Sequence, residues 1–381
     1  MPCLDCFVEF RRKQTPEQES RLKIFLLTDI PSPYQVEILN EIANDKSIDL
    51  HVAYLRDKDP ERSWTGSRIE HEYSVLNNGV DRVATARDVL KTADFAVFNF
   101  YLNPNAQSLI DERARSRKPW CFWGERPGLR KPEWVGRIAR LWKLRWLHQS
   151  SAPIWGIGEF AVERYRSEFG SRRSYFNFPY FSQLERFKVA SDKRHREQET
   201  VFLFSGSLIP RKGVDLLSRA FVRLRNEGHN VRLRILGAGP LLPDLRDTLS
   251  SIRDSVEFLG FSDWSELPAR YASSDVLCVP SRYDGWGLVV PEGLAAGLPV
   301  IATDRMGAAL EFVETGKNGW LIQSDSEDAI LNAMRAAATA PKTTLKNLSA
   351  GAVASIQHHT LSKGAERFKT YVLEGVQSWS A

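Results

Sequence analysis

The chain has 381 residues, of which 43% are hydrophobic and 26% are charged, with a formal net charge of +5. This length predicts two domains, and the absence of a long apolar run excludes a membrane-spanning helix. The charged start does not resemble a secretory signal, four cysteines do not form a disulfide framework, and the modest charge does not indicate nucleic-acid binding. We therefore expect a cytoplasmic protein. Cys3 and Cys6 form a CxxC pair without a second pair of ligands, so no metal site is expected.

Strand-like and helix-like segments alternate along the first half of the chain. After a polar leader at residues 1–20, "RLKIFLLTDI" is typical of a buried strand, and a helix is predicted from about Tyr34. Further strands are predicted at "IDLHVAYL", "DFAVFNF" and "KPWCFWG". Short apolar strands with little polar alternation indicate a parallel sheet covered on both faces. Residues 21–190 are therefore predicted to form a first α/β domain.

Cations and tryptophans gather at residues 113–146 of this domain. Eleven Lys or Arg lie between Arg113 and Arg145, against two acids. The run "EWVGRIARLWKLRWLH" has the spacing of one helix carrying both Trp and cations. Two interpretations remain open, namely a helix that contacts an anionic membrane surface and a covering helix whose tryptophans are buried.

The same alternation restarts after the polar segment "ASDKRHREQE", and residues 191–199 are the predicted linker. Strands are predicted at "TVFLFSGS", "VRLRILGAGP", "VEFLGF" and "DVLCVPS", with helices between them. This pattern predicts a second doubly wound domain at residues 200–360 and a cleft between the domains. Ligands bind beyond the carboxyl ends of the strands in such sheets. A final helix is predicted at residues 361–381.

Three glycine-bearing turns each follow a predicted strand of the second domain, at "FSGSLIPRKG", "LGAGP" and "YDGWGLVVPEG". Glycine lets the backbone approach a ligand closely, and amides at a helix start favour a phosphate. Arg211 and Lys212 can neutralise phosphate charge without a metal. "GAGP" is also typical of a simple strand end, and a basic pair is also typical of a solvated helix start.

Two acids flank the third turn. If residues 285–287 form the turn and a helix begins near Leu288, the free amides of Gly287, Leu288 and Val289 face the phosphate site. Glu292 would then accept hydrogen bonds from ribose hydroxyls, and Asp284 would meet a second polyol. One acid for each sugar, with a diphosphate between them, describes a nucleotide sugar. The alternative is that Asp284 caps a turn and Glu292 complements a helix dipole.

"PSRYDGWGLVVPEGLAAGLPVIAT", with "FSGSLIPRKGVDLLSRAF" and "ALEFVETGKNGWLI", resembles the donor domain of retaining glycosyltransferase family 4, glycosyl transferases group 1. The resemblance covers about residues 200–323. It implies a GT-B fold, no bound metal and a nucleotide-diphosphate sugar as co-substrate rather than a cofactor. Asp284 would contact the transferred sugar and Glu292 the ribose. The implied donor site comprises Gly206, Ser207, Arg211, Lys212, Gly237, Gly285, Trp286, Gly287, Leu288, Val289 and Glu292.

The chain departs from the family pattern at several positions. Asp284 stands where Glu is usual, and Ser207 stands where many members have Arg. "LTDIPSPYQVEILNEIA" is similar to a subgroup in which Pro33 and Tyr34 replace a glycine-rich acceptor loop. Glu125, in "CFWGERPG", is the candidate for the acceptor-side polar role that a His fills in many members, with His71 and His148 as substitutes.

The resemblance implies a retaining, metal-independent glycosyltransferase that acts on a glycan or lipid-linked saccharide. Domain closure about the linker would bring the acceptor to the donor. Two other classes remain. One is a non-catalytic nucleotide-sugar-binding or assembly protein with the same fold. The other is a Rossmann oxidoreductase based on "GAGP", which lacks the full GxGxxG pattern.

Overall fold

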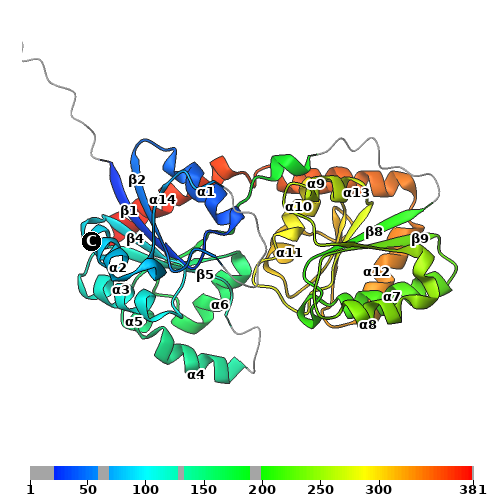
Figure 1. The fold of residues 1–381 in the computed structure, drawn as a ribbon, viewed down its shortest axis with the longest axis horizontal. Helices are drawn as coiled ribbons and strands as arrows, with labels where there is room; N and C mark the ends of the chain where they lie inside the picture. The colour runs from blue at the N-terminus through cyan, green and yellow to red at the C-terminus, as the bar shows by residue number, and fades with distance from the viewer. Residues whose placement is uncertain (1–20, 59–67, 128–132, 189–198, 380–381) are drawn as a thin grey trace, which may run out of the picture.

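A computed structural model describes residues 21–58, 68–127, 133–188 and 199–379 of the chain. Within these residues the first domain is built on a seven-stranded parallel sheet with the order β3-β2-β1-β4-β5-β6-β7 (Figure 1). Its elements are β1 (Leu22–Thr28), α1 (Pro33–Ala43), β2 (Ile48–Tyr54), β3 (Glu72–Val75), η1 (Leu76–Asn78), α2 (Val80–Thr92), β4 (Phe95–Phe98), α3 (Pro104–Arg115), β5 (Trp120–Gly124), α4 (Glu133–Lys143), α5 (Arg145–His148), β6 (Ile154–Gly156), α6 (Glu159–Phe169) and β7 (Tyr175–Asn177).

The second domain repeats this design around a six-stranded parallel sheet with the order β10-β9-β8-β11-β12-β13 in the described residues. It comprises β8 (Thr200–Ser205), η4 (Pro210–Lys212), α7 (Val214–Asn226), β9 (Val231–Leu236), α8 (Leu242–Thr248), η5 (Ser250–Ser255), β10 (Val256–Gly260), α9 (Leu267–Ala272), β11 (Val276–Val279), α10 (Val289–Ala295), β12 (Val300–Thr303), α11 (Gly307–Phe312), β13 (Gly319–Ile322), α12 (Glu327–Thr339) and α13 (Lys342–Ile356).

The predicted class, α/β with two Rossmann-like doubly wound domains, is confirmed. Apolar strands such as β1 and β11 are buried on both faces, because helices cover each side of a parallel sheet. The strand order reverses between β1 and β4 in the first sheet and between β8 and β11 in the second. Ligands bind at this switch point in open α/β sheets. The loops after β8 and β11 are those in which the sequence placed the donor motifs.

Two segments join the domains. The 3₁₀-helix η2 (Leu184–Phe187) packs beside α9 and α10, where the Phe187 and Tyr271 rings lie 5.2 Å apart. Helix α14 (Leu361–Trp379) returns to the first domain and packs on α1 (Figure 1). Gly364 allows this approach, because a Cβ there would lie 2.7 Å from the Phe181 ring and 2.8 Å from Ile38 Cδ1. The predicted leader, and the predicted linker apart from Glu199, lie outside the described residues.

The basic, Trp-rich segment differs from its predicted form. The single predicted helix is two helices, α4 and α5, with Leu144 between them. Arg113 is buried and donates hydrogen bonds to backbone carbonyls, among them those of Leu90 and Ala93. Arg140 is also buried and forms an ion pair with Glu168 of α6. The cations of residues 113–146 therefore do not form one continuous basic surface.

Some tryptophans of the segment are buried and others are exposed, so each of the two interpretations applies to a part of them. Trp120, Trp123 and Trp146 are buried in the first domain. Trp134 and Trp142 on α4 are 69% and 81% exposed, and three further apolar side chains of that helix, Val135, Ile138 and Leu141, are exposed with them. The interpretation of a covering helix with buried tryptophans is therefore wrong for α4. Helix α4 projects from the first domain (Figure 1). Its five exposed apolar side chains are here called the α4 face.

Candidate active site

A pocket of about 520 Å³ lies between the two domains, where the carboxyl ends of both sheets face each other. The second domain contributes most of its wall through the loops after β8, β9, β10 and β11. The first domain contributes the start of α1, the end of β5 and Tyr180. Fourteen of the predicted site residues line this pocket: Pro33, Tyr34, Glu125, Gly206, Ser207, Arg211, Lys212, Gly237, Asp284, Trp286, Gly287, Leu288, Val289 and Glu292.

Asp284 and the two predicted phosphate-binding cations are in direct contact. Lys212 Nζ lies 2.5 Å from Asp284 Oδ2, and Arg211 Nη1 lies 3.2 Å from the same oxygen. Burial by itself would raise the pKa of Asp284, but the charges of Lys212 and Arg211 outweigh burial and hold this pKa below its ordinary value. Asp284 is therefore ionised at neutral pH, and the three groups together carry one net positive charge.

The Gly-Trp-Gly turn contacts the first domain and contains a left-handed glycine. A Cβ on Gly285 would lie 2.0 Å from Glu125 Oε2, so the Glu125 carboxylate of the first domain packs against this glycine. Gly287 has a φ of +94°, a conformation that glycine adopts without strain. Gly285 itself is not among the residues lining the pocket, although it was predicted to belong to the donor site.

Trp286 serves chiefly as an anchor of the turn. Its side chain is 1% exposed and packs against Gly158 of the first domain, where a Cβ would lie 2.7 Å from the indole ring. The Phe312 ring lies 5.7 Å from it and the His359 ring 6.3 Å. The turn is thus fixed against the junction of the domains by an aromatic cluster.

The helix after the turn begins at Val289, with Leu288 as its N-cap, one residue from the predicted start. At this end of the helix the Val290 amide donates a hydrogen bond of 3.0 Å to the Gly287 carbonyl. The amides of residues 287–289 precede that bond, as the sequence predicted, and all three residues line the pocket.

Glu292 lies at the buried end of the pocket and is 5% exposed. The Tyr271 hydroxyl on α9 donates a hydrogen bond of 3.1 Å to Glu292 Oε2. Burial raises the pKa of Glu292 to about 7, against the opposing effect of this hydrogen bond. The carboxyl group is therefore close to half ionised at neutral pH, and one of its oxygens is fixed in direction by Tyr271.

The acceptor-side residues meet across the pocket from the donor loops. Tyr34 at the start of α1 packs against Tyr180, with ring centroids 4.8 Å apart. Glu125 follows β5, and its backbone carbonyl accepts a 2.7 Å hydrogen bond from the Tyr165 hydroxyl. The structure thus brings Glu125 and Asp284, from different domains, to the same pocket.

Neither substitute histidine lies there. His71 is buried beside β3, where its ring contacts the Tyr54 hydroxyl and Asn40. His148 packs on Phe169 at the far side of the first domain, with ring centroids 4.4 Å apart. Both residues are absent from the pocket lining, and the suggestion that either replaces the acceptor-side histidine is wrong.

Some residues at the site were missed by sequence reasoning. Tyr271 lies in the helix "LPARYA", whose pattern marks it only as a buried apolar position. Phe261 and Trp264 follow β10 and line the pocket, and Phe261 is 55% exposed there. The rule that ligands bind beyond strand ends pointed to this loop, but no glycine-rich motif singled it out.

The structure is similar to solved structures over most of its length. HepE from Anabaena, solved in complex with UDP and glucose, matches with a TM-score of 0.72 and 17% identity over 93% of this chain and 100% of that chain. Sucrose-phosphate synthase from Thermosynechococcus elongatus matches with a TM-score of 0.73 and 16% identity over 94% of this chain and 100% of that chain. At these identities the likeness concerns the fold, and the chain has the GT-B fold of glycosyltransferases.

The family follows from the sequence comparisons. Residues 185–352 match the model of glycosyl transferases group 1. The chain is 31% identical over 207 residues to a GDP-mannose-dependent alpha-(1-6)-phosphatidylinositol monomannoside mannosyltransferase from Mycolicibacterium smegmatis, over 50% of this chain and 54% of that protein. The chain thus spans about half the length of the curated relatives it matches. The predicted family is confirmed.

Proposed function

We propose that this protein is a glycosyltransferase that moves a sugar from a nucleotide-diphosphate sugar to a saccharide or lipid-linked acceptor, with retention of configuration. The observation that carries the proposal is the convergence of Asp284, Lys212, the Gly-Trp-Gly turn and Glu292 on one pocket between two Rossmann-like domains. The family of residues 185–352 supports it. A hexose as the transferred group, and use in polysaccharide or glycolipid synthesis, accord with the names of the relatives.

Each group has a role in this proposal. Glu292 accepts hydrogen bonds from the ribose hydroxyls, while Arg211, Lys212 and the amides of residues 287–289 hold the diphosphate. The bond between the anomeric carbon and the diphosphate oxygen breaks, and the two cations stabilise the charge that develops on the leaving group. This stabilisation needs no bound metal. Asp284 contacts the transferred sugar and keeps both cations beside it.

The acceptor enters from the first domain, past Pro33 and Tyr34. Its hydroxyl oxygen bonds to the anomeric carbon on the face that the diphosphate leaves, and the hydroxyl proton passes to the Glu125 carboxylate. Glu125 suits this role because it faces the Gly-Trp-Gly turn from the acceptor side.

Calorimetry tests the donor part. The protein is titrated with UDP, GDP, ADP, CMP and their sugar conjugates in EDTA and again with Mg²⁺. We expect one nucleoside diphosphate to bind without metal, and Glu292→Ala to weaken it by about tenfold or more. Binding by none of them, to a folded protein, would remove the proposal. Transfer to simple glycosides, with NMR of the anomeric proton, then tests retention and separates an enzyme from a non-catalytic binder.

For the acceptor we propose a lipid-linked saccharide, reached through contact of the α4 face with an anionic bilayer. The α4 face exposes Trp134 and Trp142 together with the cations Arg137 and Lys143, the mixture that suits a lipid interface. None of the helices in the described part of the chain has the length and apolar composition of a membrane span.

Vesicle sedimentation tests the α4 face. The protein should sediment with vesicles containing 30 mol% phosphatidylglycerol more than with neutral ones, and Trp134→Ser with Trp142→Ser should remove about 1 kcal/mol or more of binding. Leu373→Ser on α14, which changes an exposed apolar residue elsewhere, is the matched control. Equal sedimentation of wild type and the double variant would exclude the α4 face as the contact.

A further inference from the structure

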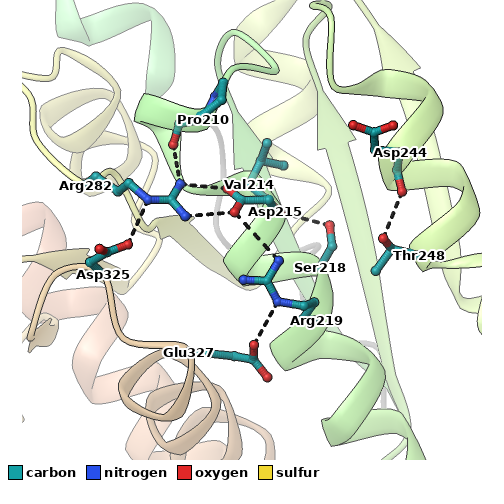
Figure 2. Close-up of polar contacts among 10 residues, drawn as sticks. All are labelled: Pro210, Val214, Asp215, Ser218, Arg219, Asp244, Thr248, Arg282, Asp325 and Glu327. Carbon is teal, nitrogen blue, oxygen red and sulfur yellow. Dashed lines mark hydrogen bonds and ion pairs between the residues drawn. The ribbon is translucent and has the colours of Figure 1, made fainter.

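Arg282 ties together the two loops that form the diphosphate end of the pocket. Its guanidinium donates to both carboxylate oxygens of Asp215, at 2.8 Å each, and to the backbone carbonyl of Pro210. Its Nε donates to Asp325 Oδ1 at 2.7 Å, and its backbone amide donates to the carbonyl of Arg211 at 2.9 Å. Figure 2 shows Arg282 between the Pro210 turn, the first turn of α7 and Asp325.

Arg282 is not itself a ligand of the pocket. It is absent from the pocket lining, which includes its neighbours Arg211, Lys212 and Asp284. Two carboxylates, those of Asp215 and Asp325, already face its charge. Its contacts therefore act on the backbone that carries Arg211 and Lys212 and not on a bound phosphate.

The loops that it joins have little freedom to rearrange separately. Gly213 has a φ of +68°, and a Cβ there would lie 2.0 Å from the carbonyl oxygen of Pro280, so the two loops touch at their backbones. Arg211 Nη1 also donates to the carbonyl of Tyr283 at 3.3 Å. A shift of the Pro210 turn would therefore move both cations away from Asp284.

We propose that Arg282 is a positioning residue of the donor site, which holds Arg211 and Lys212 beside Asp284 and so prepares them for the diphosphate. This inference rests on the proposed function of the pocket. An arginine is required because its planar fork satisfies a carboxylate through two parallel bonds while further N–H groups reach a backbone carbonyl and a second acid. A lysine at position 282 keeps the charge but cannot make these contacts together.

Binding measurements on five variants test the inference. Arg282→Lys and Asp215→Asn should each weaken the preferred nucleoside diphosphate by about tenfold in calorimetry, because two charge-assisted contacts lose their fixed positions. The matched control is Arg335→Lys. Arg335 lies on α12, away from the loops, and its Nε and Nη2 donate two parallel hydrogen bonds to the Glu227 carboxylate. In a Lys212→Ala background the effect of Arg282→Lys should be smaller, because Arg282 then positions only Arg211.

A second readout needs no ligand. Lys212 is paired with Asp284 and is 18% exposed, so its rate of acylation by an N-hydroxysuccinimide ester, measured on the tryptic peptide, should be low in wild type. It should rise several-fold in Arg282→Lys and stay unchanged in Arg335→Lys, at equal melting temperatures. A purely structural role would lower the melting temperature without this selective increase.

The outcomes separate the two proposals. If wild type binds a diphosphate, and Arg282→Lys neither weakens it nor alters Lys212 acylation, the positioning role is overturned and the proposed function stands. If wild type binds no diphosphate, the proposed function fails, while the acylation rates still decide whether Arg282 holds Lys212 in place.

Discussion

Glu292 combines burial with a proposed role, the binding of ribose hydroxyls, that requires its ionised form. The pKa of about 7 arises because burial disfavours the carboxylate, whereas two ribose hydroxyls bind best to a carboxylate. Binding of a nucleotide-diphosphate sugar should therefore strengthen as the pH rises, being about tenfold tighter at pH 8 than at pH 6. The sugar conjugate is the appropriate ligand, since its phosphates do not titrate in this range.

Glu292→Gln provides the control for that experiment. Its amide keeps the size of the side chain but does not titrate, so calorimetry at pH 6, 7 and 8 should give a weaker affinity that no longer changes with pH. A wild-type affinity that is equally flat would show that Glu292 is not the group that governs donor binding.

The same shift affects the stability of the unliganded protein. Between the ordinary pKa of 4.5 and about 7, the folded protein retains the Glu292 proton that the unfolded chain has released. The contribution of Glu292 to the free energy of unfolding is thus largest at low pH and falls as the pH rises through this window. In urea denaturation, Glu292→Gln should gain stability relative to wild type from pH 5 to pH 8. A constant difference between the two proteins would contradict the raised pKa.

At the scale of single elements, the Arg140–Glu168 ion pair attaches α4 to α6. Arg140 makes contacts of 2.7 to 3.0 Å with both carboxylate oxygens of Glu168, and the two side chains are 8% and 2% exposed. Arg140→Ala should lower the free energy of unfolding by about 3 kcal/mol, because it leaves a buried carboxylate poorly paired. Arg335→Ala, which breaks an exposed pair of similar geometry, should lower the free energy of unfolding much less, because solvent screens that pair.

Chemical denaturation of the two variants checks this difference. Arg164, 3.7 Å from Glu168, can take over part of the pairing, and a double variant with Arg164→Ala would then show the larger loss. Equal, small losses for Arg140→Ala and Arg335→Ala would mean that the buried pair does not hold α4.

Strands with apolar runs could be predicted from the sequence, including the four-residue strands β4 and β11, whereas three-residue strands could not. The strands β1, β2, β8 and β9, of six or seven residues each, were located within a few residues of their bounds. Strands β6 and β7, with three residues each, are too short for a periodic signal. Their place in the sheet depends on contacts between distant segments, which periodicity does not express.

Some residues of the candidate site could likewise be predicted from the sequence, and others could not. Turn glycines and helix-start cations can be recognised because their chemistry is local, and the predicted ones other than Gly285 line the pocket. Tyr271 could not be recognised, because its hydroxyl meets Glu292 only when α9 packs beside α10. The burial of Arg113 and Arg140 was also not predictable. A charged residue is expected at the surface, and the sequence does not show that the fold supplies carbonyls or an acid to pair with it.

At the scale of the whole molecule, Glu311 of α11 links the second domain to the first. Its Oε1 accepts a 2.7 Å hydrogen bond from Asn177 Nδ2, and its Oε2 accepts a 3.0 Å bond from the amide of Glu159, at the N-terminus of α6. A carboxylate is favoured there because helix amides and the helix dipole both attract it. Glu311 therefore helps to hold Glu125 and Asp284 on facing sides of one pocket.

Glu311→Ala should slow transfer more than it weakens donor binding. The proposed diphosphate site is built from loops of the second domain, so calorimetric affinity for the nucleoside diphosphate should stay within about twofold of wild type. The rate of transfer should fall by about tenfold, because the acceptor-side groups are no longer held in register with the donor. Small-angle scattering should report a larger radius of gyration. Glu314→Ala changes an exposed acid three positions further along the chain, which is paired only with Lys317 among the described ion pairs, and should change none of these quantities. A parallel loss of affinity and rate in Glu311→Ala would instead place its effect within the second domain and contradict a role in joining the two.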